Sequence, residues 1–153
     1  MAPPSSNRNK QIPVTLQHLQ ALRFHLTLTN TFDATVFAMA CVSFWSDWCQ
    51  CRLAEVCVDG AFDPSRHATR ECLRLGGSTA SGVKFGRFRA PYTKTSPLGQ
   101  DIIWKDSACP CSTEWAFRNH LSINNNIPNT AALFAFEDKA GKPIPMPQTW
   151  FME

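Results

Sequence analysis

Residues 32–48 read FDATVFAMACVSFWSDW, and this run largely decides which fold the chain can adopt. The run is apolar nearly all round, and it is too long and too rich in alanine and methionine for a strand. We therefore expect a buried central helix from Phe32 to Trp48. Asn30, followed by Asp33 three residues later, is typical of a helix N-terminus and marks where this helix begins.

A second helix is expected on the N-terminal side of this run. Four leucines have the spacing of one apolar helix face: Leu16, Leu19, Leu22 and Leu26. They predict a helix from Val14 to Leu28 that starts at Pro13 or Thr15. Residues 1–11 are polar and are expected to form a disordered tail, so we assign residues 12–153 to a single domain.

Beyond residue 59 the pattern changes from helical to extended, with turn signals rich in glycine and proline. Strands are expected at residues 69–75, 83–92 and 101–104, with a flexible link at residues 76–82. A three-stranded antiparallel sheet is the economical arrangement of these segments.

A further helix should follow the sheet. Pro110 is expected to open it in its first turn, and it should run to Ile123. A short apolar segment at residues 132–136, a turn at residues 139–142 and a final helical start at Gln148 or Thr149 complete the prediction. The fold class is therefore α+β, mainly helical with a small three-stranded antiparallel sheet.

Composition and charge narrow the possible functions. With 153 residues, 44% apolar and 18% charged, the chain has the composition of one globular domain. The longest apolar stretch, Ala34 to Trp45, is too short to span a bilayer. Because the N-terminus is polar, we do not expect it to be a signal peptide. Seven cysteines in irregular clusters suggest a reduced, intracellular protein.

The net charge of +3 is concentrated in one segment. Residues 64–100 contain one acidic residue, Glu71, and these basic ones: Arg66, Arg70, Arg74, Lys84, Arg87, Arg89 and Lys94. Both flanking segments are negative. Such a basic run is a footprint for a polyanion, although charge alone fits a solvated sheet face equally well.

Two short motifs carry residues suited to phosphate chemistry. Residues 48–58 read WCQCRLAEVCV, in which Arg52 and Glu55 are three apart and can share a helix face. Residues 91–95 read PYTKT, with Lys94 at the edge of a hairpin. Arginine stays protonated and donates two parallel hydrogen bonds to a phosphate. The alternatives are a surface ion pair and a solubilising hairpin lysine.

These motifs, together with others in the same order, resemble the catalytic domain of tyrosine recombinases of the phage-integrase type. The resemblance is closest to crypton-like members from basidiomycete fungi and covers roughly Ile12 to Glu153. The segments that carry it are IPVTLQHLQAL, FDATVFAMACVSFW, CRLAE, FDPSRH, PYTKT, CP…FRNHL and LFAF. It implies a partial recombinase fold, DNA as the partner, a nuclear location, and neither a metal nor another cofactor.

The resemblance also implies roles for three residues. Arg52 would hold the phosphate on which a tyrosine acts, Glu55 would brace the site, and Lys94 would be the general acid for the leaving oxygen. With no metal in this chemistry, such cations must stabilise the charge that develops on the phosphate.

The chain departs from the family after Lys94, where a His-x-x-Arg box and the nucleophilic tyrosine are expected. His67 and Arg70 form such a box, but it precedes Lys94. His120 is followed by Leu-Ser-Ile, and we expect it on a helix surface. Tyr92, the sole tyrosine, should share a strand and a face with Lys94 and does not match the nucleophile. We therefore expect a domain truncated before these elements.

The function expected is that of a DNA-binding fragment of a recombinase or integrase, involved in DNA recombination and not catalytic alone, with self-association possible. Its backbone contacts would come from Lys84, Arg87 and Arg89. One alternative is a domesticated DNA-binding module without chemistry.

A small zinc or scaffold domain is the third hypothesis. Its ligands would be two close cysteine pairs, Cys49 with Cys51 and Cys109 with Cys111, but zinc pairs usually have a wider spacing. The remaining cysteines discussed are expected to be small core residues: Cys41, Cys57 and Cys72.

Aromatic residues give two further expectations. The tryptophans, which are Trp45, Trp48, Trp104, Trp115 and Trp150, should belong to the core. An exposed apolar surface is expected near four residues towards the C-terminus, and it predicts low stability. These residues are Phe134, Phe136, Trp150 and Phe151.

Overall fold

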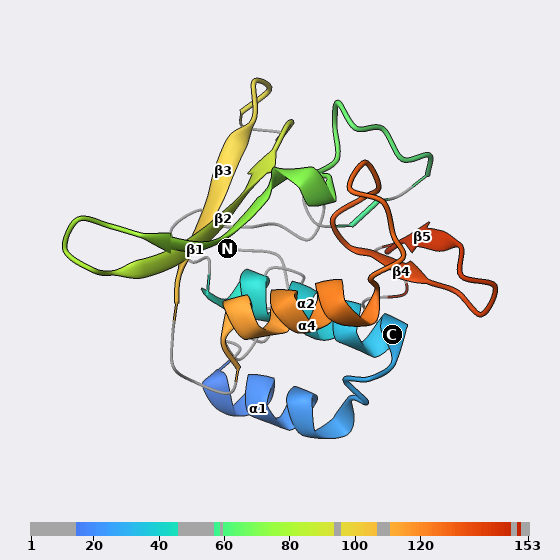
Figure 1. Ribbon diagram of the computed structural model, residues 1–153, viewed down its shortest axis with the longest axis horizontal. Coiled ribbons are helices and arrows are strands. Elements are labelled where there is room, and N and C mark those ends of the chain that lie inside the picture. Colours follow the sequence, from blue (N-terminus) through green and yellow to red (C-terminus); the bar gives the residue numbers. More distant parts are fainter. Residues whose placement is uncertain are drawn as a thin grey trace, which may run out of the picture.

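The computed structural model describes residues 15–45, 57–58, 60–93, 96–106, 111–147 and 150. Its elements are α1 (Leu16–His25), α2 (Thr31–Trp45), the 3-10 helix η3 (Arg70–Cys72), β1 (Leu73–Ser78), β2 (Lys84–Ala90), β3 (Gln100–Lys105), α4 (Thr113–Ile123), β4 (Ala135–Glu137) and β5 (Pro143–Pro145). Helices and antiparallel strands are both present, which confirms the α+β class. In Figure 1 the helices pack together on one side of the three-stranded sheet.

Helix α2 is the buried centre of the described part of the chain. Every residue from Ala34 to Met39 is buried, as expected for a run that is apolar all round. The side-chain oxygen of Asn30 accepts hydrogen bonds from the backbone N–H groups of Phe32 (3.0 Å) and Asp33 (3.1 Å). The predicted buried helix and its start are therefore confirmed, while residues 46–48 lie outside the described residues.

Helix α1 begins where one of the two predicted starts lies. Thr15 caps it, and His18 completes a capping box by accepting from the backbone N–H of Thr15 at 3.0 Å. The helix ends at His25 instead of Leu28, and Leu19 is its buried residue. It lies against α2 on the side away from the sheet (Figure 1).

The three-stranded sheet has the order β1-β2-β3, and both pairs are antiparallel, as predicted. Strands β2 and β3 lie within one or two residues of the predicted limits. Strand β1 does not: the predicted segment 69–75 begins with η3, and the strand continues through residues 76–78.

The prediction of a flexible link at Gly76 and Gly77 was wrong. The register shifts between Arg74 and Gly77, so β1 is irregular there, and Gly76 adopts a φ of 72°. Pairing then resumes with Gly77 opposite Phe85. Pairing with a long neighbouring strand outweighs the low strand propensity of glycine.

The inner face of the sheet packs on the helices through aromatic side chains. Phe88 and Trp104 are almost fully buried, and the Trp104 ring stacks on Phe117 of α4 with centroids 5.1 Å apart. Phe134, which follows α4, packs edge-on against Phe88 at 6.1 Å. One core therefore joins the sheet, α2 and α4.

Helix α4 starts later than predicted, and a small second sheet follows it. Ser112 caps the helix by accepting from the N–H of Trp115 at 3.3 Å, so the first helical residue is Thr113 and not Pro110. Strands β4 and β5 form an antiparallel pair around the predicted turn at 139–142. The proposed helical start at residues 148–149 lies outside the described residues.

Several burial predictions were wrong. Trp104 is a core residue, but Trp115 and Trp150 are 40% and 45% exposed. Of the residues expected at an exposed apolar surface, Trp150 is exposed, but Phe134 and Phe136 are buried. Phe134 packs against Phe88, Phe117 and His120, and Phe136 packs against Phe32 of α2. Trp48 and Phe151 lie outside the described residues.

Candidate functional site

The sheet has one face that points away from the helices and carries exposed charges. Side chains alternate between the faces of a strand. Because Phe88 is buried on the inner face of β2, Arg87 and Arg89 project from the opposite side. Directly paired residues share a face, and those opposite the two arginines on β3 are Ile103 and Asp101. We call this surface the outer face. Its residues are Arg74, Phe85, Arg87, Arg89, Asp101, Ile103 and Lys105.

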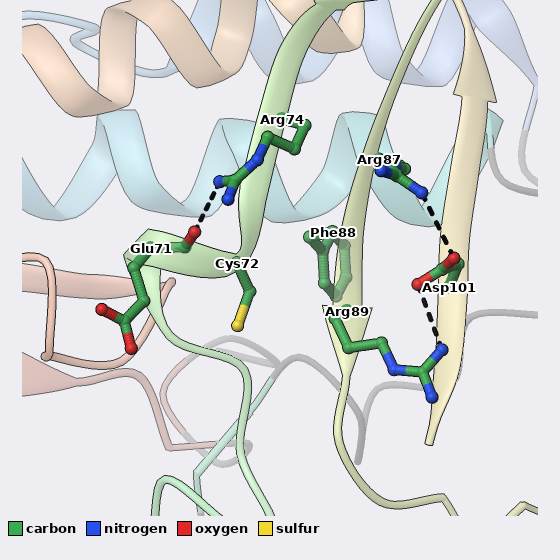
Figure 2. A pocket seen from close by; sticks show the side chains of 7 residues that line it. All are labelled: Glu71, Cys72, Arg74, Arg87, Phe88, Arg89 and Asp101. Atoms are coloured by element: carbon green, nitrogen blue, oxygen red, sulfur yellow. Dashed lines mark hydrogen bonds and ion pairs between the residues drawn. The ribbon is translucent and has the colours of Figure 1, made fainter. Parts of the chain in front are cut away.

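Asp101 joins the two arginines of β2. Its Oδ1 accepts a hydrogen bond from Arg89 Nη1 at 3.3 Å, and its Oδ2 lies 3.6 Å from Arg87 Nη1. Figure 2 shows the carboxylate between the two guanidinium groups. The side chains of Arg87 and Arg89 are 49% and 48% exposed, and that of Asp101 is 36% exposed. Water therefore screens both ion pairs. One carboxylate balances only one of the two positive charges.

Arg74 adds a third guanidinium from β1, directly opposite Arg87 in the register. Its Nη1 donates to the backbone oxygens of Glu71 at 2.6 Å and Leu73 at 3.0 Å, which fixes the position of the group. The three arginines border an open depression of about 290 Å³. Its lining residues are Glu71, Cys72, Arg74, Arg87, Phe88, Arg89 and Asp101 (Figure 2).

The structure brings only part of the predicted site together. Arg87 and Arg89 lie side by side, as their i, i+2 spacing predicts. Lys84 does not join them, because alternation along β2 places it on the face of Phe88. The predicted catalytic residues, namely Arg52, Glu55 and Lys94, lie outside the described residues.

Two cationic residues of the outer face were not among the predicted site residues. Arg74 belonged to the basic run, but only the β1–β2 register shows that it faces Arg87. Lys105 lies opposite Phe85 at the far end of β3. The alternation of apolar and polar side chains along β3 could have placed Lys105 on the exposed face, because Ile102 and Trp104 mark the buried face.

Arg70, another member of the basic run, is turned inward. Its residue is 8% exposed, and its Nη1 donates to the backbone oxygens of Asn124 at 2.8 Å and Ile127 at 2.9 Å. Burial lowers the pKa of Arg70, and the charge of Glu137 opposes that shift. Arg70 therefore ties η3 to the segment after α4, and it adds nothing to the outer face.

His120 was predicted on a helix surface, and that prediction was wrong. It is fully buried on the inner side of α4. Its Nε2 donates to the backbone oxygen of Leu133 at 2.9 Å, and its Nδ1 lies 3.0 Å from Thr35 Oγ1 and 3.2 Å from Asn124 Nδ2. Burial lowers the pKa of His120 to about 4, so the ring is neutral near pH 7. This cluster is structural and links α2, α4 and the 127–133 segment.

Tyr92 lies after the end of β2, so the prediction that it shares a strand with Lys94 was wrong. Its ring is 39% exposed and accepts a cation–π contact from Arg66, whose guanidinium carbon is 4.8 Å from the ring centroid. The contact ties the loop before η3 to the end of β2.

The described residues contain no group of three or more metal-ligating side chains. Cys41 and Cys57 are buried, as predicted for small core residues. Cys72 is half-buried, and its Sγ lies 3.1 Å from Thr69 Oγ1. Among these same residues, no helix has the length and hydropathy to cross a membrane.

Comparisons with protein-family models, with curated proteins and with solved structures find no match to this chain.

Proposed function

We propose that this chain binds DNA through the phosphate backbone, and that the outer face makes the contacts. The observation that carries the proposal is the grouping of Arg74, Arg87 and Arg89 around one open depression, with Asp101 as the carboxylate shared by two of them. Guanidinium groups bind phosphate oxygens through paired, charge-assisted hydrogen bonds. A phosphate bound between Arg87 and Arg89 would take the place of the Asp101 carboxylate.

The resemblance to tyrosine recombinases supports DNA as the polyanion. Under this proposal the chain is part of a DNA strand-transfer domain that acts in recombination and integration in the nucleus. Arg52, Glu55 and Lys94 would then lie near the scissile phosphate, and the outer face would hold neighbouring phosphates. The binding proposal rests on the outer face, since those three residues are not described.

The test measures binding of a fluorescently labelled DNA of about 20 nucleotides, single-stranded or duplex, by anisotropy at salt concentrations between about 50 and 200 mM. We expect affinity to fall steeply with salt, because each phosphate contact releases counterions. Arg87→Ala combined with Arg89→Ala should reduce the slope of log affinity against log salt by about two, or about one for each lost contact.

Two controls match these variants. Lys84→Ala removes a cation from the same strand but from its other face, and Arg118→Ala removes an exposed, ion-paired arginine from α4. Neither should change the slope. Salt-independent binding, or a double variant that binds like the unmodified protein, would exclude the outer face as the DNA site.

A further inference from the structure

The outer face also carries apolar side chains beside its arginines. Ile103 lies directly opposite Arg87 and is 43% exposed in the middle of β3. Phe85 lies two residues before Arg87 on the same side of β2 and is partly exposed. Phe85 pairs with Lys105 and Ile103 pairs with Arg87, so each apolar side chain lies directly beside a cationic one. Same-face side chains along a strand are about 7 Å apart.

Phe85 is held against the sheet by the absence of a side chain opposite it. Its partner on β1 is Gly77, and a Cβ atom placed on Gly77 would lie 2.9 Å from Phe85 Cζ. The ring therefore rests directly on the β1 backbone instead of standing out from the sheet. An aromatic ring laid along a sheet surface is the geometry on which a nucleic acid base can stack.

The two kinds of side chain favour different parts of a nucleic acid. Arginines bind phosphates whether the DNA is double- or single-stranded. In a duplex the bases are stacked inside, and the exposed backbone offers nothing to a phenyl ring or an isoleucine. In a single strand the bases are free to turn outward and stack on aromatic side chains. Apolar side chains placed among phosphate-binding arginines therefore favour a single strand.

We propose that the outer face is a platform for single-stranded DNA, on which a base stacks on Phe85, its neighbour covers Ile103, and the flanking phosphates bind Arg87 and Arg89. This inference rests on the proposed function and specifies the form of DNA that the site takes.

The test compares three probes of about 20 nucleotides by fluorescence anisotropy: oligothymidylate, an abasic strand of the same length, and a duplex. Oligothymidylate should bind about 5- to 150-fold more tightly than the abasic strand, since stacking of one base contributes about 1–3 kcal/mol. The duplex should bind more weakly than oligothymidylate at the same salt concentration.

Variants of Phe85 identify the stacking residue. Phe85→Leu should abolish the difference between oligothymidylate and the abasic strand, whereas Phe85→Tyr, which keeps an aromatic ring, should retain it. Phe24→Ala removes a phenylalanine that is 87% exposed on α1 and should change nothing. Circular dichroism checks that each variant is folded.

The outcomes separate this inference from the proposed function. Equal binding of oligothymidylate and the abasic strand, or tighter binding of the duplex, would overturn the single-strand platform and leave phosphate binding intact. The same holds if Phe85→Leu keeps the preference for bases. Failure of all three probes to bind at low salt would overturn both.

Discussion

The inner and outer faces of β2 are built from alternate residues of one strand, yet they have different environments. On the inner face, Gly86 and Phe88 are buried against Trp104 and the helices. On the outer face, Arg87 and Arg89 are about half exposed and share one carboxylate. One β-strand can thus pack against the core with one set of residues and present the alternate set to a ligand.

The same contrast separates arginines of one basic run. Arg70 is buried, and its Nη1 donates hydrogen bonds to two backbone oxygens. Arg87 is exposed and forms an ion pair with Asp101 at 3.6 Å. Truncating a buried group leaves its partners without hydrogen bonds, and truncating an exposed one does not. The charge of a residue therefore does not predict its role until its face is known.

Two glycines on opposite faces of this sheet allow the sharpest test of the contrast. In Gly86→Ala the new Cβ would lie 2.6 Å from Cε2 of the Trp104 ring, which is only 1% exposed. We expect a loss of about 3 kcal/mol in the free energy of unfolding, at the upper end for overpacked cores. Urea denaturation followed by circular dichroism measures it.

Gly77→Ala is the matched variant on the outer face. Its Cβ meets only the ring of Phe85, which is partly exposed and can rotate away. The loss of stability should be about 0.5 kcal/mol, which is the usual size for surface substitutions. If both variants lose the same stability, the two faces do not differ in packing as described.

The pH dependence of stability tests the interior at His120. Its pKa is about 4 in the folded chain and about 6.5 when unfolded, so between these values the unfolded chain binds a proton that the folded chain does not. The free energy of unfolding should therefore fall as the pH is lowered from 6.5 to 4, by up to about 3 kcal/mol from this residue.

Urea denaturation at a series of pH values measures the effect, and the difference between variants isolates it. His120→Gln should be less stable at pH 7 but lose less stability on acidification. His25→Gln, which changes an exposed histidine of α1, should keep the original slope. An unchanged slope in His120→Gln would show that the ring is not held neutral.

Helix α2 and strands β2 and β3 could be predicted because their local signals agree with their surroundings. The apolar run from Ala34 to Met39 has one stable environment, a core. The alternation of Phe88 with Arg87 and Arg89 predicts both a strand and its exposed side. Where local pattern and tertiary environment coincide, sequence reasoning succeeds.

The failures at β1 and β5 share one physical cause, which is dependence on distant partners. Gly76 and Gly77 have low strand propensity, and pairing with β2 places them in β1. Likewise β5, which begins and ends with proline, exists because Ile144 pairs with Phe136. No local pattern contains this information.

His120 is a different kind of failure, because a signal was present. Thr113, Ala116, Phe117 and His120 have the spacing of one helix face, and all are buried. A histidine on such a face should be assigned to the interior. At the candidate site, the position of Arg74 opposite Arg87 could be found only from the pairing register of β1 and β2. The roles of Arg52, Glu55 and Lys94 remain predictions.

The smallest expected effect concerns Asp101, which belongs to the outer face but would compete with the DNA phosphate that we propose binds there. Its carboxylate occupies the position between Arg87 and Arg89 that a phosphate would take. Asp101→Asn should therefore tighten DNA binding about threefold to tenfold, because two exposed ion pairs of up to about 1 kcal/mol each no longer compete. Anisotropy titrations at fixed salt measure the change.

A matched control is Glu114→Gln, which removes an ion-paired carboxylate from α4, where it lies 2.7 Å from Arg118. It makes the same change in net charge but lies on the helix, so it should leave DNA affinity nearly unchanged. If both variants tighten binding equally, the gain comes from net charge alone. A gain confined to Asp101→Asn means that the carboxylate and the phosphate compete for the same two guanidinium groups, which assigns the phosphate to Arg87 and Arg89.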